Sequence, residues 1–200
     1  MKLADKFTWL RGFLAPVFFV VYFIPEWTGL FGRVSVFVMI PLLAVAEITD
    51  YFDGYFARKY NEVSDFGKLF DPFCDVLLNL TVLLCLTLSG YFPAIALLLI
   101  MYREFVINFV RLMAAQKRVA IGARKGGKTK TVTYIVTGFY TLFLESCKRL
   151  RFTLPPFTTA VVIALSVLCV ILAYASLTDY LISFRDVVFG KKENTSPTGN

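Results

Sequence analysis

Four aspartates lie at the boundaries of long apolar runs. Asp50 and Asp53 close one run, and Asp71 and Asp75 open the next. An ionised side chain at membrane depth costs several kcal/mol unless it is paired, hydrated or bound to a metal. Because four carboxylates close together repel one another strongly without cations, we predict that these aspartates are ligands for cations.

The spacing of the aspartates places each pair on one helix face. Residues three and four apart share a face, so Asp50 lies with Asp53, and Asp71 lies with Asp75. The short segment between the pairs makes the two helices antiparallel neighbours, whose acidic faces can meet near one membrane surface. Carboxylate oxygens without histidine or thiolate suit Mg²⁺ or Mn²⁺. Four carboxylates suit about two such ions, which can also hold a substrate pyrophosphate.

Small residues accompany the aspartates, and histidine is absent from the chain. Gly54, Ala57 and Gly67 leave room for a nucleotide or phosphate near the backbone, although tight packing of membrane helices explains them equally well. The lack of histidine excludes Ser-His hydrolases and most zinc enzymes. The four cysteines match no metal motif and are expected to be buried or lipid-facing.

The elements that must position these residues are membrane helices. Hydrophobic residues make up 58% of the 200 residues, above the roughly 45–50% of soluble domains, and they fall in runs long enough to cross a bilayer. We predict an all-α integral membrane protein with six transmembrane helices and a short N-terminal interfacial helix over residues 1–8. The six predicted spans are 9–24, 34–57, 68–88, 92–114, 129–144 and 157–181.

The distribution of charge predicts an orientation and the ends of the domain. The net charge is +7, and most basic residues fall on one side if both termini lie in the cytoplasm, which matches the positive-inside pattern of a cell membrane. The acidic pairs then face the cytoplasm. The basic group at 148–151 departs from this pattern. We predict a membrane domain at 1–190, a disordered cytoplasmic tail at 191–200, no cleavable signal peptide and no nucleic-acid partner.

Eight residues around the acidic pairs follow one spacing pattern. They form the string Asp50-x2-Asp53-Gly54-x2-Ala57-Arg58-x8-Gly67-x3-Asp71-x3-Asp75. This string, called the signature below, resembles the complete motif of the CDP-alcohol phosphatidyltransferases, with all eight fixed positions present. The six-span layout extends the resemblance over most of the chain.

The resemblance implies a role for each matched residue. The metal ligands would be Asp50, Asp53, Asp71 and Asp75, which would hold two Mg²⁺ or Mn²⁺ ions. Asp75 would also be the catalytic base that takes the proton from the acceptor hydroxyl, and a carboxylate is the available choice without histidine. The residues around the cytidine diphosphate would be Asp53, Gly54, Ala57, Arg58 and Gly67. The resemblance also implies a homodimer and CDP-diacylglycerol as the donor.

The acceptor alcohol is predicted from a second set of residues. The run Tyr102-Arg103-Glu104, with Arg111 and the stretch 127–131, is similar to the phosphatidylglycerophosphate synthase branch and implies glycerol 3-phosphate as acceptor. The residues that would bind its phosphate are Arg103, Arg111, Lys128 and Lys130, since fixed cations suit a phosphate. Other readings remain open: Glu104 can pair with the arginines inside the membrane, and the lysines can be ordinary loop charges.

Two positions depart from the pattern of that branch. The branch has Pro-Asn before the first span, whereas this chain has Lys6-Phe7-Thr8. The branch also has a Lys after the last signature aspartate, whereas this chain has Val76. We expect both departures to leave the metal site untouched.

The alternatives to the predicted function are the same reaction with inositol phosphate, inositol or serine as acceptor, a relative that binds CDP-lipids without activity, and a cation transporter.

Overall fold

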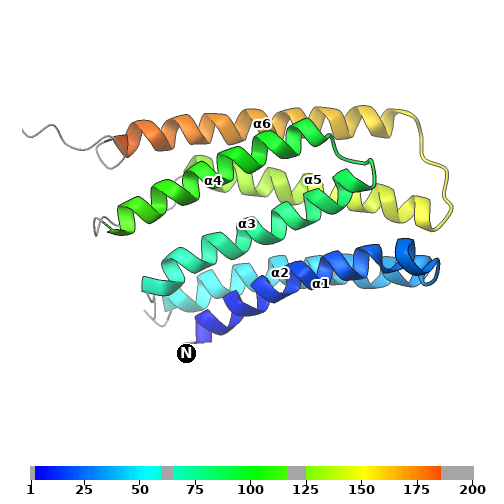
Figure 1. The fold of residues 1–200 in the computed structure, drawn as a ribbon, viewed down its shortest axis with the longest axis horizontal. Coiled ribbons are helices and arrows are strands. Elements are labelled where there is room, and N and C mark those ends of the chain that lie inside the picture. Colours follow the sequence, from blue (N-terminus) through cyan, green and yellow to red (C-terminus); the bar gives the residue numbers. More distant parts are fainter. Residues whose placement is uncertain (1–2, 60–64, 117–124, 186–200) are drawn as a thin grey trace, which may run out of the picture.

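Over the residues that the structure describes, the chain folds into six long helices (Figure 1). The computed structural model describes residues 3–59, 65–116 and 125–185, and within them the side chains of 8–49, 67, 70–116, 127 and 129–185. The helices are α1 (Leu3–Thr28), α2 (Gly32–Lys59), α3 (Asp65–Leu88), α4 (Ala94–Gln116), α5 (Lys125–Arg149) and α6 (Phe157–Ser183). The all-α prediction is confirmed, and each predicted span falls almost wholly within one helix.

Four of the described helices are long and apolar enough to cross a membrane. Their apolar stretches are Thr8–Thr28, Gly32–Thr49, Phe70–Leu88 and Phe157–Ser183. Only 22% of the α6 stretch is buried inside the bundle, and large apolar side chains such as Phe37 and Ile171 are exposed. An apolar outer surface of this kind is typical of a protein that faces lipid. The chain is therefore a multi-pass membrane protein.

The predicted short helix over residues 1–8 is not confirmed as a separate element. Residues 3–8 form the first turns of α1, which continues without interruption to Thr28. The segment contains no glycine or proline that would end a helix before the apolar run. Thr8 and Arg11 therefore lie on one continuous helix. The predicted tail at 191–200 lies outside the described residues.

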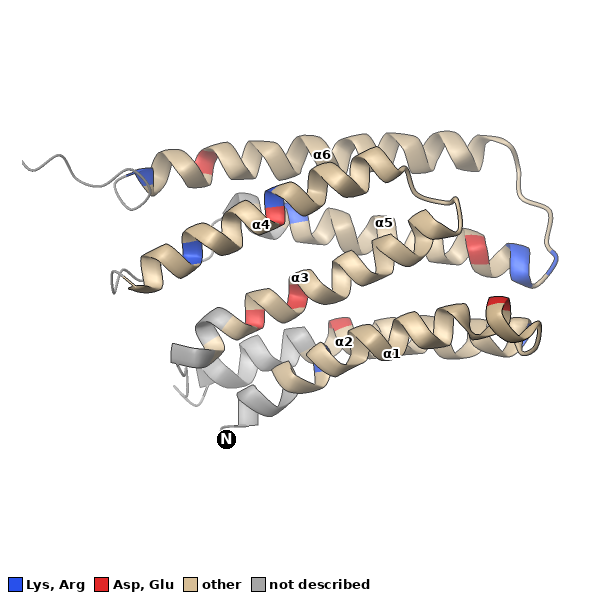
Figure 2. Ribbon diagram, viewed as in Figure 1, with Lys and Arg blue, Asp and Glu red and all other residues tan. Residues whose placement is uncertain are grey.

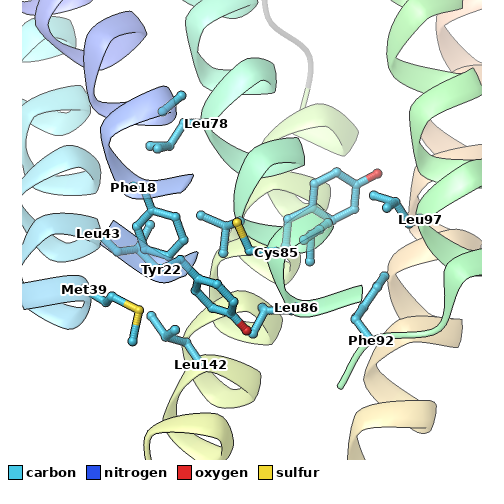
Figure 3. Packing of buried hydrophobic residues seen from close by; sticks show 14 of the residues in the cluster. Phe18, Tyr22, Met39, Leu43, Leu78, Cys85, Leu86, Phe92, Leu97 and Leu142 are labelled. Carbon is cyan, nitrogen blue, oxygen red and sulfur yellow. The ribbon is translucent and has the colours of Figure 1, made fainter. Parts of the chain in front are cut away.

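The helices pack in two groups that are joined by α3 and by the contact of α2 with α5. α1 packs against α2 and α3, α6 packs against α4 and α5, and α3 also contacts α4 and α5. Figure 3 shows the centre of this packing, where Phe18 of α1, Met39 of α2, Leu86 of α3 and Leu142 of α5 come together. These side chains are buried, so the apolar core holds α1, α2, α3 and α5 at fixed positions.

Figure 2 shows charged residues on α2, α3, α4 and α6 from near the middle of the bundle toward one end, and a second group at the opposite end, where α1 and α5 finish. We call the end where α2 finishes and α3 begins the signature end, because the signature spans these two segments. The far end is the opposite one, where α1 and α5 finish and a short turn connects α3 to α4 (Figure 1). Gly90 closes this turn with a φ of +78°, a conformation that glycine adopts without strain.

The far end contains a buried polar group that we call the Arg149 cluster. Arg149 Nε donates to Glu145 Oε1 at 2.7 Å, Nη1 donates to Ser35 Oγ at 2.8 Å, and Nη2 donates to the Tyr22 carbonyl at 3.0 Å. Arg149 therefore joins α5 to α1 and α2, and Glu145 balances its charge. This pairing explains part of the departure of the basic group at 148–151 from the positive-inside pattern.

Candidate active site

The signature spans the last turns of α2 and the first turns of α3. The α2 positions are Asp50, Asp53, Gly54, Ala57 and Arg58. The side chains of these residues lie outside the described part of the chain. On α3, Gly67 is buried, and Asp71 and Asp75 are half-buried. The backbone thus places both halves of the signature at the same end of the bundle.

Two residues of α1 contact the predicted ligands on α3. The Thr8 hydroxyl donates to Asp71 Oδ1, and Arg11 Nη1 donates to Asp75 Oδ1 in a salt bridge. Arg11 is only 1% exposed, whereas the Asp75 side chain is 35% exposed. A buried guanidinium therefore holds one oxygen of Asp75, while the carboxylate stays accessible from outside the protein.

α1 and α3 approach each other closely beside these contacts. A Cβ added at Gly12 would lie 3.2 Å from Cys74 Sγ, which is tighter than most contacts in a packed interior. The rings of Trp9 and Phe70 pack nearby with centroids 4.8 Å apart. The absence of a side chain at Gly12 thus lets α1 come close enough for Arg11 to reach Asp75.

The N-terminal departure was expected to leave the metal site untouched, but one of its residues contacts a predicted ligand. Thr8 belongs to that segment and contacts Asp71, and Arg11 follows one turn later and contacts Asp75. The partners are 63 and 64 residues apart in the chain, so no local spacing connects them. The available signal was Arg11 itself, because an arginine inside an apolar run needs an acidic or polar partner.

A small cavity of about 10 Å³ lies between α2, α3 and α5. Its lining includes Glu47 of α2, Asn79 of α3 and Tyr134 of α5, and Asn79 Nδ2 donates to the Asp75 carbonyl at 2.9 Å. Glu47 lies one turn before Asp50, and Asn79 lies one turn after Asp75. The acidic segments of α2 and α3 therefore lie at a similar depth in the bundle. The cavity has room for about one water molecule.

The predicted ligand positions fit a site for hard divalent cations. Asp71 and Asp75 share one face of α3, and Asp50 and Asp53 are three residues apart at a similar depth on α2. Carboxylate oxygens are the donors that Mg²⁺ and Mn²⁺ prefer. Among the side chains that the structure describes, no group of three or more possible ligands comes together. The side chains of Asp50 and Asp53, which are half of the predicted set, are not among those described.

A second polar group, called the Glu104 cluster, joins α4, α5 and α6. Glu104 Oε2 accepts from Arg103 Nη1 at 2.8 Å, and Glu104 Oε1 accepts from Lys130 Nζ at 2.5 Å. Arg103 Nη2 donates to Ser176 Oγ at 2.9 Å, and Nε donates to the Ala173 carbonyl at 3.3 Å. Glu104 is 3% exposed. The predicted pairing of Glu104 with an arginine is confirmed for Arg103.

The structure brings two of the four predicted acceptor residues together. Arg103 and Lys130 share Glu104, and Arg111 lies eight residues after Arg103 on α4. The Lys128 side chain lies outside the described part of the chain. A group of cations from α4 and α5 therefore gathers inside the bundle, with one acidic residue among them.

The Glu104 cluster lies next to the cavity near the acidic residues. Lys130 Nζ lies 4.7 Å from the centroid of the Tyr134 ring, and Tyr134 lines the cavity together with Asn79. Asn79 in turn bonds to the backbone of Asp75. A short chain of contacts thus connects the cations of α4 and α5 to the α3 segment that carries the signature aspartates.

The fold and the polar groups define a helical membrane protein with an acidic signature at one end and a cationic group beside it. Residues 1–172 match the model of the CDP-alcohol phosphatidyltransferase family. The chain belongs to this family. The match begins in the segment before α1 and ends within α6, so it includes the signature, the contacts from α1 and the Glu104 residue of α4.

Three relatives carry the name CDP-diacylglycerol–glycerol-3-phosphate 3-phosphatidyltransferase. The protein of Treponema pallidum is 38% identical over 152 residues, which cover 73% of this chain and 70% of that protein. The protein of Bacillus subtilis is 36% identical over 145 residues, covering 68% and 73%. The protein of Mycoplasma genitalium is 38% identical over 124 residues, covering 59% and 52%, so the match spans about half of its length.

Proposed function

We propose that this chain transfers the phosphatidyl group of CDP-diacylglycerol to glycerol 3-phosphate, releases CMP and forms phosphatidylglycerophosphate, a step of phospholipid biosynthesis. The family match and the shared name of three relatives support this reaction. The observation that carries the proposal is the accessible carboxylate of Asp75, which Arg11 holds at the end of the bundle that bears the signature.

The proposed metal ligands are Asp50, Asp53, Asp71 and Asp75, for two Mg²⁺ or Mn²⁺ ions. Such ions, when bound, would neutralise the charge of the pyrophosphate and stabilise CMP as it leaves. Thr8 and Arg11 each hold one carboxylate oxygen on α3. These bonds restrict the rotation of both aspartates, so that their orientation is set before a substrate arrives.

The proposed site for the cytidine diphosphate is formed by Asp53, Gly54, Ala57, Arg58 and Gly67. The small residues would let the nucleotide approach the backbone of α2 and α3. Arg58 would add a positive charge next to the diphosphate. Gly67 lies at the start of α3.

The proposed base is Asp75, which would take the proton from the acceptor hydroxyl. The hydroxyl oxygen would then form a bond to the phosphorus of the phosphatidyl group, and the phosphorus–oxygen bond to CMP would break. Asp75 suits this role because 35% of its side chain is exposed and because a chain without histidine must use another base.

The proposed binding residues for the acceptor phosphate are Arg103, Arg111, Lys128 and Lys130. Two of them share Glu104, and Arg111 lies eight residues after Arg103 on α4. The arrangement supports an acceptor that carries its own negative charge, because an uncharged alcohol would not require several cations in the bundle interior. Glycerol 3-phosphate meets this requirement.

We also propose an arrangement in the membrane. All six helices would span the bilayer, and the signature end and both termini would face the cytoplasm of the cell membrane. Residues 1–190 would form the membrane domain, 191–200 would be a disordered tail, and two chains would form a homodimer. The family match and the four apolar stretches support a multi-pass arrangement of this kind.

A product assay tests the proposed function. Purified protein is incubated with CDP-diacylglycerol, Mg²⁺ and one labelled alcohol at a time: glycerol 3-phosphate, inositol phosphate, inositol or serine. We expect a labelled lipid from glycerol 3-phosphate alone, and none from Asp75→Asn. A lipid formed from a different alcohol would contradict the acceptor, and the absence of any labelled lipid would contradict the reaction.

A further inference from the structure

Arg103 is the most firmly held cation of the Glu104 cluster. A guanidinium carries five N–H donors, and the described bonds use three of them. The partners are the Glu104 carboxylate, the Ser176 hydroxyl and the Ala173 carbonyl. Arg103 itself is 4% exposed, so its long side chain is fixed between α4 and α6.

The partners of Arg103 differ in what they do to its charge. Glu104 carries a full negative charge and therefore weakens the attraction of Arg103 and Lys130 for a phosphate. Ser176 is neutral, so its hydroxyl fixes the Nη2 end of the guanidinium without reducing the positive charge. A neutral partner on a different helix can thus set the position of a cation and leave its attraction for an anion intact.

We propose that Ser176 is a positioning residue for the phosphate of the acceptor, acting through Arg103. This inference rests on the proposed function, because Arg103 must be one of the cations that bind the acceptor. Ser176 lies on α6, 73 residues from Arg103, and it belongs to none of the sequence patterns that identify the site. Its effect is to hold the guanidinium in one orientation, so that the N–H groups left over by the described bonds keep a fixed direction.

The test compares Ser176→Ala with Thr178→Ala in steady-state kinetics of the full-length protein. Thr178 lies on the same helix, is exposed, and bonds to the Tyr174 carbonyl of its own helix. We expect Ser176→Ala to raise the KM for glycerol 3-phosphate about threefold to tenfold, less than the loss of a direct hydrogen bond to a charged group, because Ser176 acts through Arg103. The kcat and the KM for CDP-diacylglycerol stay unchanged, and Thr178→Ala matches the wild type.

A second arm tests whether Ser176 acts through Arg103. In an Arg103→Ala background, Ser176→Ala should cause no further rise in the KM for glycerol 3-phosphate, because the partner of the hydroxyl is gone. Glu104 keeps its bond from Lys130 in this background, so the buried carboxylate still has a cation beside it. If the double variant has too little activity for a KM to be measured, the comparison of Ser176→Ala with Thr178→Ala still tests the inference.

Each result separates the inference from the proposed function. A rise in the acceptor KM alone, which disappears in the Arg103→Ala background, supports the inference. An unchanged acceptor KM overturns it, and so does a parallel rise in both KM values, which indicates a structural role for Ser176. If the wild type forms no lipid from glycerol 3-phosphate, the proposed function fails before any variant is compared.

Discussion

The two ends of the bundle each contain a buried arginine paired with an acid, but the pairs differ in exposure. At the far end, Glu145 lies one turn from Arg149 on the same helix, and its side chain is 5% exposed. At the signature end, Arg11 of α1 pairs with Asp75 of α3, and the Asp75 side chain is 35% exposed. The acid of the far pair is thus the more buried of the two, although Glu145 and Arg149 line a cavity of about 330 Å³, whereas a third of the Asp75 side chain is exposed.

This difference shows how similar ion pairs can serve packing or chemistry. The bonds of Arg149 connect α5 to α1 and α2. The bond of Arg11 orients a carboxylate that can still meet a substrate. We therefore expect changes at the signature end to lower turnover per folded molecule, and changes at the far end to lower stability instead. We expect the loss of turnover to decrease in the order Asp75→Asn, Arg11→Ala, Gly12→Ala and Arg149→Ala.

The largest loss is expected for Asp75→Asn. The amide keeps the shape of the side chain but cannot take a proton, so turnover should fall by about 10³-fold or more. Labelled-lipid formation per folded molecule measures this loss. Asp179→Asn, which changes an exposed aspartate of α6, is the matched control and should retain wild-type turnover. An active Asp75→Asn protein would show that another group is the base.

A smaller loss is expected for Arg11→Ala. Asp75 then loses the bond that orients it, and we expect turnover to fall by about 10- to 100-fold, as for other losses of orientation at a reacting group. Arg11→Lys, which keeps the charge, should recover part of the activity. Arg33→Ala removes an exposed arginine at the start of α2 and serves as the control. Equal turnover of Arg11→Ala and Arg33→Ala would mean that Arg11 does not support the site.

Gly12→Ala should produce a several-fold loss. The new Cβ would lie 3.2 Å from Cys74 Sγ, so α1 must shift slightly away from α3, and Arg11 moves with it. The second change Cys74→Ala removes the sulfur and should restore turnover in the double variant. Turnover of the single and double variants is compared in one assay. A loss that persists in the double variant would contradict this steric explanation.

The smallest effect on turnover is expected for Arg149→Ala at the far end. Removal of one partner of a buried pair leaves Glu145 uncompensated and costs about 3 kcal/mol of stability. Thermal unfolding in detergent should show a lower Tm than for Arg151→Ala, which changes an exposed residue. Turnover per folded molecule should match the wild type. A large loss of turnover in the folded fraction would mean that the two ends are coupled.

The sequence predicted the parts of the site that local spacing encodes. Residues three or four apart on a helix must share a face, so the grouping of Asp71 with Asp75 followed from their positions. Contacts between distant helices had no such signal: Thr8 and Arg11 reach α3 across more than 60 residues, and Ser176 reaches Arg103 across 73. Their partners depend on how the helices pack, which periodicity does not determine.

The fold was predictable to a similar degree. Long apolar runs determined the helices, and their predicted spans lie within α1 to α6. The separate N-terminal helix was not confirmed, because composition alone does not show whether a short mixed segment continues into the next helix. The sequence also did not show what balances the basic group at 148–151. The structure shows that Glu145 balances the charge of Arg149.

We propose that carboxylates of α2 and α3 form a metal-dependent centre for phosphatidyl transfer. The most direct measurement is lipid formation by the wild-type protein from CDP-diacylglycerol and glycerol 3-phosphate, first in excess EDTA and then after Mg²⁺ or Mn²⁺ is added back. We expect turnover to stop when the chelator is present and to return when the cation is added back. Undiminished turnover in excess EDTA would contradict it.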